Sequence, residues 1–184
     1  MNLVKSHDTH QESGEDNADA LSQYLSFQIK GESYAIGILS IREIIQYGRV
    51  TSVPMMPDFI HGVINLRGAV VPVIDLARRF GKSATQINRR TCVVLIELPN
   101  EGGENETQLL GLLVDTVNEV VDIPPEAVLP PPAFGSRIRS DFILGMGKLA
   151  DDFIIVLNVP RILSRGDMEW VNQLDHSALK ADAN

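Results

Sequence analysis

The chain has 184 residues, of which 44% are hydrophobic, so it contains enough apolar material for one large or two small folded domains. Aromatic residues make up only 5% of the sequence, and aliphatic side chains therefore have to build most of the core. The formal net charge is −8, so the chain has no excess of basic residues with which to bind nucleic acid or an anionic membrane surface.

The negative charge is concentrated at the two ends of the chain. Residues 1–20 carry five acidic residues against one lysine, a net charge of −4, and residues 165–184 contribute a further −2. Residues 1–21 are also poor in large apolar groups, and we expect a disordered acidic tail there. The histidines of this tail, His7 and His10, have no further ligands beside them, so we interpret them as incidental rather than as a metal site.

The N-terminal residues lack the apolar core of a secretory signal, and no apolar run approaches the length that spans a bilayer. The sequence therefore predicts a cytoplasmic protein with no direct membrane insertion. Cys92 is the only cysteine and lies within an apolar run, so it has no partner for an internal disulfide. We interpret it as a buried, inert thiol.

The first predicted strand begins at Leu25, where apolar and polar residues alternate as far as Ile29. A second alternating run covers residues 34–38 after a turn at residues 31–32. The period then changes, because Ile38, Ile41 and Ile45 fall at helical spacing. We expect a short helical turn here, with Arg42 and Glu43 outside, before the chain extends again.

The most informative stretch is residues 59–76, FIHGVINLRGAVVPVIDL. Apolar residues fill nearly every position on both sides of NLRG at residues 65–68, a pattern typical of two buried strands joined by a tight turn. Gly68 can adopt the positive φ that such a turn needs, and Arg67 is then carried near the tip. Pro72 has no backbone N–H, so we expect the second strand to be an edge strand or to contain a bulge at that position.

A short helix is predicted directly after this hairpin, with Asp75 as its N-cap and Gly81 at its end. Residues 91–98 form a continuous apolar run, which is typical of a central strand buried on both faces. A Gly/Glu/Asn loop over residues 99–108 follows, and we expect its length to be variable.

Further strands are predicted in the C-terminal half. They cover residues 109–114, 117–123, 142–149 and 153–157, and the last two form a hairpin. Asn158 is expected to cap a brief helix. The end of the chain leaves two alternatives open, a weak terminal helix or a frayed tail. About nine short strands with frequent turn signals favour a sandwich or barrel.

The hairpin also carries a resemblance. The run PDFIHGVINLRG at residues 57–68 resembles the signature of the CheW family, the coupling proteins of bacterial chemotaxis. The similarity extends over about residues 22–164 and includes four further motifs: YLSF at 24–27, VVPVIDL at 70–76, GLLVD at 111–115 and VLNV at 156–159.

The resemblance implies a mainly all-β fold, in which two small five-stranded SH3-like barrels pack around a shared apolar seam, with short helices. Residues 22–164 would form this CheW-like domain, between the acidic tail of residues 1–21 and a C-terminal tail of residues 165–184. It also implies a non-catalytic scaffold with no cofactor and two partners, the cytoplasmic tip of a chemoreceptor and the regulatory domain of the histidine kinase CheA. Such a protein would be recruited to membrane-associated receptor arrays.

The residues that the resemblance assigns to receptor binding lie on two short stretches and, less surely, on a third: Ile41, Glu43, Ile44, Gly62, Arg67, Leu110 and Gly111. The isoleucines would supply apolar contact, and Arg67 and Glu43 would supply direction. Two roles stay open for these charges, because they can contact a partner or pair with each other inside the chain.

An enzyme would need a catalytic constellation, and the sequence offers none. No serine lies in a nucleophile elbow, and there is no glycine-rich phosphate loop. Four acidic residues could form carboxylate pairs, although caps and turns already account for two of them: Glu43, Asp75, Asp115 and Asp122. The alternative to a chemotaxis scaffold is therefore a generic β-barrel interaction module of another signalling pathway.

Overall fold

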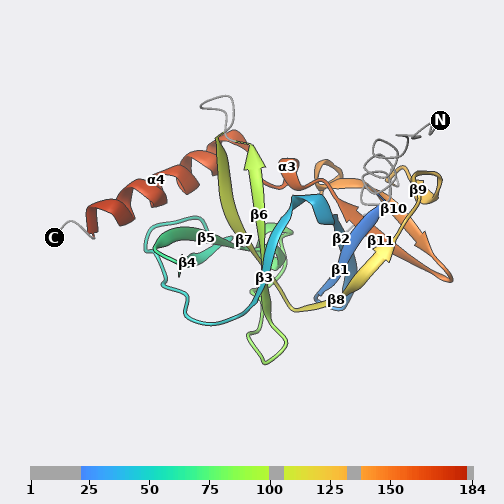
Figure 1. Cartoon of the computed structure of the whole chain (residues 1–184), viewed down its shortest axis with the longest axis horizontal. Helices are drawn as coiled ribbons and strands as arrows, with labels where there is room; N and C mark the ends of the chain where they lie inside the picture. The colour runs from blue at the N-terminus through green and yellow to red at the C-terminus, as the bar shows by residue number, and fades with distance from the viewer. Residues whose placement is uncertain (1–21, 100–105, 132–137, 182–184) are drawn as a thin grey trace, which may run out of the picture.

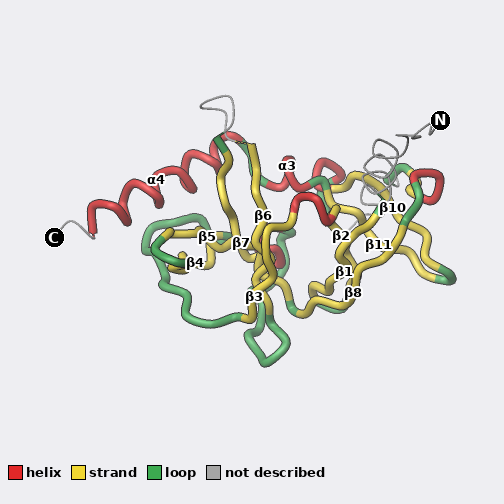
Figure 2. The backbone as a smooth tube through the Cα atoms, viewed as in Figure 1, coloured by secondary structure: helices red, strands yellow, loops and turns green. Residues whose placement is uncertain are grey.

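The computed structural model describes residues 22–99, 106–131 and 138–181, and these residues form two β-sheets with a few short helices and one longer C-terminal helix (Figure 1). The predicted all-β class is confirmed. Most of the tube in Figure 2 is strand or loop, and the long helix lies at the C-terminal end. The predictions for the acidic tail and for most of the 99–108 loop concern residues outside these ranges.

The first sheet has five strands in the order β3-β6-β7-β5-β4. Their bounds are β3 (Ile41–Gln46), β6 (Cys92–Pro99), β7 (Thr107–Val114), β5 (Ala69–Asp75) and β4 (Ile60–Leu66). The short helix α2 (Leu76–Arg79) follows β5, and the Asp75 carboxylate caps it by accepting a hydrogen bond from the Ala77 N–H, as predicted. We call this sheet with α2 the five-stranded lobe.

The second sheet has six strands in the order β8-β1-β2-β11-β10-β9. Their bounds are β8 (Thr116–Asp122), β1 (Gln23–Ile29), β2 (Glu32–Gly37), β11 (Asp152–Leu157), β10 (Ile143–Leu149) and β9 (Val128–Leu129). The sixth strand was not expected: β9 has only two residues and pairs with Met146 and Gly147. With η3 (Ser140–Phe142) and α3 (Val159–Ile162) this sheet makes up the six-stranded lobe.

Three further helical elements lie within the described residues. They are η1 (Ile38–Ser40), η2 (Pro125–Ala127) and α4 (Arg165–Ala181). α4 crosses from the end of the six-stranded lobe to the five-stranded lobe, where it contacts β5 (Figure 1). Its Val171 and Leu174 side chains are buried in the main core.

The five-stranded sheet is rolled so that its two outer strands approach each other. Thr51, which follows β3, exchanges two backbone hydrogen bonds of 2.9 and 2.8 Å with Val63 on β4. Because β3 and β4 are the first and last strands of the sheet, these bonds bring its opposite edges together, as the closure of a small barrel requires.

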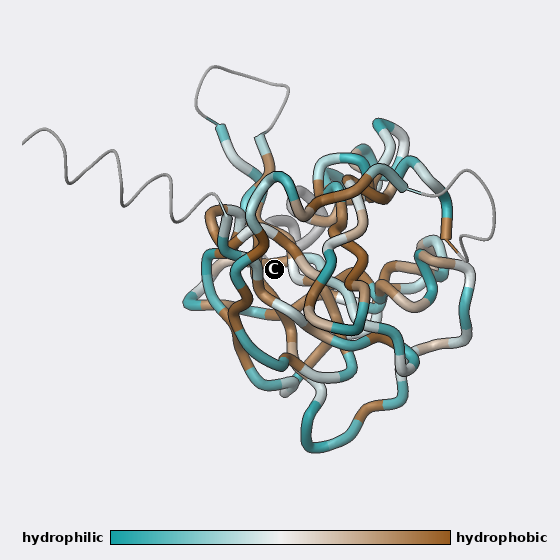
Figure 3. Tube along the Cα trace, turned by 90° about the vertical axis from the view of Figure 1, so that its right-hand side faces the viewer, coloured by the Kyte–Doolittle hydropathy of each residue, from teal (hydrophilic) through white to brown (hydrophobic). Residues whose placement is uncertain are grey.

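The buried apolar residues fall into three clusters that match two rolled sheets and a seam. One cluster, around Val73 and Leu95, lies within the five-stranded sheet, and a smaller one, around Ile154 and Val156, lies within the six-stranded sheet. The largest cluster takes residues from both lobes and includes Phe27 on β1. In Figure 3 many of the hydrophobic segments run through the middle of the trace, and hydrophilic segments form many of its outer turns. The predicted shared apolar seam is therefore present.

The predicted helical turn around residue 41 was only partly right. Residues 38–40 form a 3₁₀ turn, but residues 41–46 are β3. A register shift between Ile41 and Glu43 places one extra residue, Arg42, opposite β6. Burial still alternates along β3, but Glu43 takes an inward position and Ile44 an outward one, so the apolar residues do not mark the strand.

Pro72 was expected on an edge strand or at a bulge, and both expectations are wrong. β5 lies between β7 and β4, and the register irregularity of the hairpin falls at His61. Pro72 is tolerated because the opposite residue, Val63, directs its backbone bonds outward to Thr51. Pairing on the other side of β5 begins only at Val73, so no ladder bond requires a donor from Pro72.

Asn158 precedes α3 as predicted, but its side chain makes no capping hydrogen bond. Its backbone N–H instead donates to the Phe142 carbonyl at 2.7 Å, which ties α3 to η3.

Candidate functional site

The tip of the β4–β5 hairpin is a two-residue turn in which both central residues have positive φ. Arg67 has φ 52° and Gly68 has φ 87°, as in a type I′ turn. The Asn65 side-chain oxygen accepts a 2.9 Å hydrogen bond from the Gly68 N–H and so stabilises the turn. The positive φ of Gly68 was predicted. The positive φ of Arg67 was not, and a bulky side chain rarely adopts it.

Arg67 pairs with Glu43 of β3 in this structure. Its Nη2 atom lies 3.2 and 3.3 Å from the two carboxylate oxygens of Glu43. The Arg67 side chain is nevertheless 76% exposed and that of Glu43 is 34% exposed. Internal pairing therefore leaves most of the guanidinium accessible to a second molecule.

The residues of β3 combine an inward-facing charge with an outward-facing apolar side chain. Ile41, Glu43 and Ile45 are half-buried, and Ile44 is 43% exposed. A strand that only covered the core would place its charge outward and its isoleucines inward. We call Glu43, Ile44 and Arg67, with Ile41 beside them, the β3–turn surface.

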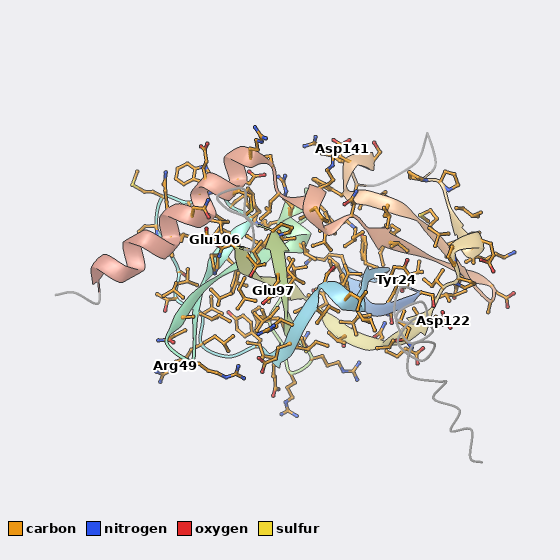
Figure 4. The ribbon with its side chains drawn as sticks, turned by 45° about the horizontal axis from the view of Figure 1, so that its top comes forward. Tyr24, Arg49, Glu97, Glu106, Asp122 and Asp141 are labelled. Carbon is orange, nitrogen blue, oxygen red and sulfur yellow. The ribbon has the colours of Figure 1, made fainter. Side chains whose placement is uncertain are left out.

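A second ion pair joins β3 to the neighbouring strand β6. Arg42 Nη1 is 3.4 Å from an oxygen of Glu97 on β6, which is labelled in Figure 4. Both side chains are exposed, so the pair contributes little to stability. It adds to the charged character of this edge of the five-stranded lobe.

Two of the candidate receptor-binding residues cannot form a contact surface. Leu110 is only 1% exposed and belongs to the main core, and Gly111 is buried in the interior strand β7. A Cβ added at Gly111 would lie 2.6 Å from a methyl carbon of Val93. These positions are therefore structural, because they allow β6 and β7 to pack closely.

Gly62 is buried as well, so it does not supply direct contact. An added Cβ at this position would clash with the Thr51 carbonyl and would come within 2.7 Å of Val50. The absence of a side chain lets the segment around Thr51 lie against β4. Gly62 thus supports the rolled shape of the sheet on which the β3–turn surface depends.

His61 is a satisfied structural histidine rather than a ligand. Its Nε2 atom lies 2.9 Å from the Tyr47 hydroxyl, and the two rings meet edge to face. Partial burial raises the pKa of Tyr47 above its ordinary value. No sequence pattern predicts this pair, since the two residues lie fourteen positions apart, with Tyr47 just after β3 and His61 on β4.

Three of the four acidic residues considered for catalysis have structural partners. Asp75 accepts hydrogen bonds from the Thr85 hydroxyl and N–H at 2.7 and 3.0 Å. Asp115 accepts one from the Lys30 N–H at 2.7 Å, and Glu43 pairs with Arg67. Asp122 is exposed on β8. These partners place the carboxylates in caps, turns and an ion pair.

Across residues 22–99, 106–131 and 138–181, no cluster of three or more histidine, cysteine or acidic side chains is arranged to hold a metal ion. Within the same ranges, no helix has the length and apolar character needed to cross a membrane.

Comparisons with known proteins agree on one family. A family model described as the CheW-like domain matches residues 23–167. The chain is 31% identical over 155 residues to the chemotaxis protein CheW of Klebsiella aerogenes, a match covering 84% of this chain and 89% of that protein. It is 34% identical over 151 residues to the CheW of Helicobacter pylori, covering 82% and 86% of the two chains.

A solved structure of a similar protein has the same fold. The scaffolding protein TtCheW from Thermoanaerobacter tengcongensis superposes with a TM-score of 0.69 at 28% identity. The match covers 89% of this chain and 94% of that one. The protein FrzA of Myxococcus xanthus is also similar, with 28% identity over 157 residues, covering 85% of this chain and 84% of FrzA.

Proposed function

The chain belongs to the CheW family of non-catalytic chemotaxis scaffolds, and we propose that it couples the cytoplasmic tip of a chemoreceptor to the regulatory domain of the histidine kinase CheA. The observation that carries the proposal is the β3–turn surface. There a charged pair and an exposed isoleucine are held on a rigid hairpin tip and an edge strand.

The β3–turn surface suits the receptor. A receptor tip is a helical hairpin, and such a partner needs an apolar contact with charges that fix its direction. Ile44 supplies the exposed apolar side chain, and the half-buried Ile41 packs against the main core. Arg67 offers donors in addition to those that face Glu43. Direct contact and internal pairing are therefore compatible roles for Arg67.

The six-stranded lobe suits the kinase. Its outer strands β8 and β9 carry the exposed apolar residues Val120 and Leu129. The CheA regulatory domain has the same two-barrel fold in this family, so a lobe of one molecule can pack against a lobe of the other in a pseudo-symmetric way. Two partners would then be held on different parts of one scaffold.

Coupling of this kind needs no chemistry in the scaffold. Receptor states that bind the scaffold and kinase with different affinity shift the kinase between active and inactive populations. The scaffold would act in the cytoplasm at receptor arrays. Residues 22–164 would carry both partner surfaces, and the acidic residues 1–20 would be dispensable for kinase binding.

Calorimetric titration tests the proposal. Purified chain is titrated separately with a receptor-tip fragment and with a CheA regulatory domain, and saturable binding of both is expected. Deletion of residues 1–20 should leave kinase affinity unchanged. Binding of neither partner would favour the alternative, a β-barrel interaction module of another signalling pathway.

A further inference from the structure

Arg79 occupies an unusual position for an arginine on a four-residue helix. Its side chain is only 15% exposed. The guanidinium carbon lies 5.0 Å from the ring centroids of both Phe59 and Phe142. Two of its nitrogens donate hydrogen bonds, Nε to the Ile162 carbonyl at 2.6 Å and Nη2 to Asp167 Oδ2 at 2.9 Å.

The partners of Arg79 come from three separate parts of the fold. Phe59 directly precedes β4 of the five-stranded lobe, and Arg79 is on α2 of the same lobe. Phe142 and Ile162 belong to the six-stranded lobe, on η3 and α3. Asp167 lies in the first turn of α4. A single side chain therefore joins both lobes and the helix that crosses between them.

The Asp167 carboxylate is itself held in place. The oxygen that accepts from Arg79 also accepts a 2.8 Å hydrogen bond from the Ser164 N–H. The Asp167 N–H in turn donates to the Ser164 hydroxyl at 3.2 Å, so the two residues cap the start of α4 reciprocally. The bond from Arg79 thus fixes the end at which α4 enters the core.

The geometry requires an arginine rather than any cation. The guanidinium is planar, so it can lie between two aromatic rings while its edge donates in two directions. A lysine ammonium would be a single point charge and could not reach the Ile162 carbonyl and the Asp167 carboxylate in the same way. The neighbouring Arg78 is more exposed and lies 3.8 Å from Asp58, so it offers a matched control.

We propose that Arg79 is a positioning residue that holds the two lobes and α4 in one relative orientation. The β3–turn surface of the five-stranded lobe then keeps a defined position relative to the outer strands of the six-stranded lobe. The orientation follows from the contacts alone, whereas its value for signalling rests on the proposed coupling function.

Distance measurements on the free chain test the orientation. Spin labels are placed on exposed strand positions of the two lobes, Gln46→Cys and Lys148→Cys, in a Cys92→Ser background. A second pair joins Gln46→Cys to Gln173→Cys on α4. Pulsed electron paramagnetic resonance then gives the distribution of each distance. Arg79→Gln should broaden both distributions relative to the parent, and Arg78→Gln should leave both unchanged.

A conservative variant keeps the test decisive if Arg79→Gln does not fold. Arg79→Lys retains the charge and should also broaden both distributions, because it loses the second donor direction. Unchanged distributions in a folded Arg79 variant would overturn the proposal.

A functional readout separates positioning from the proposed function. Arg79→Lys should bind the isolated receptor-tip fragment with the parent affinity, yet reduce receptor control of CheA activity by at least about fivefold. Control equal to that of the parent would contradict the signalling part of the proposal. If the parent chain binds neither partner, the proposed function fails while the distance result still decides the role of Arg79.

Discussion

Arg67 and Glu43 meet across the gap between the two outer strands of the five-stranded sheet, with Nη2 of Arg67 3.2 Å from a carboxylate oxygen of Glu43. Arg67 lies at the tip of the β4–β5 hairpin and Glu43 lies on β3. The pair thus bridges the same two edges that the Thr51–Val63 bonds join farther along β4. It contributes to the shape of the rolled sheet and exposes a guanidinium at its rim.

Replacing Arg67 by alanine should weaken receptor binding far more than it weakens the fold. An exposed ion pair contributes at most about 1 kcal/mol, so the Tm should fall by less than about 4 °C. Loss of a central arginine contact costs about 2 kcal/mol, or about 30-fold in Kd. Calorimetry with a receptor-tip fragment and thermal unfolding give the two values. The control is Arg90→Ala, which removes an exposed arginine outside the pair. A large fall in Tm for Arg67→Ala would show instead that Arg67 acts mainly in stability.

Exchanging the two charges separates internal pairing from direct contact. The double variant Glu43→Arg with Arg67→Glu keeps an ion pair across the sheet edges but reverses the charge presented at the hairpin tip. If Arg67 contacts the receptor, the double variant should bind the receptor-tip fragment no better than Arg67→Ala. Recovery of the parent affinity would show that only the internal pair matters.

The hairpin of residues 59–76 was predictable because its signals are local. The turn geometry depends on Gly68, and the cap of α2 depends on Asp75, the last residue of β5. The prediction of a helical turn at β3 was only partly right because Ile38, Ile41 and Ile45 fall at helical spacing, although burial along the strand alternates every two residues. Glu43 lies at an inward position and Ile44 at an outward one, so polarity does not follow burial at these two residues of the β3–turn surface.

Gly111 should act through packing rather than through partner contact. Gly111→Ala places a Cβ 2.6 Å from a Val93 methyl carbon between interior strands, and such overpacking costs about 1–3 kcal/mol. Urea unfolding should show this loss, and receptor affinity of the remaining folded protein should be unchanged. Gly48→Ala, where nothing lies within 4 Å of the new Cβ, is the matched control. A stable Gly111→Ala protein that no longer binds receptor would contradict the structural role.

The Asp75 carboxylate should be a major determinant of stability in the five-stranded lobe. It is 1% exposed and accepts bonds from the Ala77 N–H and from both donors of Thr85. Asp75→Ala would leave buried donors unsatisfied and should lower the free energy of unfolding by about 3 kcal/mol. Urea titration measures the loss against Asp122→Ala, which removes an exposed carboxylate and should be nearly neutral. Equal effects of the two substitutions would refute this assignment.

The tertiary features were not predictable from local patterns. A proline such as Pro72 is expected on an edge strand. Its interior position is explained by the opposite residue, Val63, whose backbone bonds point outward to Thr51. The resemblance to a family brought Leu110 into the candidate site, although its side chain lies in the core. The Arg79 contacts also join segments more than eighty residues apart, which no periodicity in the sequence indicates.

Simultaneous binding tests the central claim most directly. Sedimentation velocity of the chain mixed with a receptor-tip fragment and a CheA regulatory domain should show one ternary species, heavier than either binary complex. Arg67→Ala should lose the receptor from that species and retain the kinase domain. Two binary complexes that exclude each other, with no ternary species at saturating concentrations, would contradict the account of this chain as a scaffold for both partners.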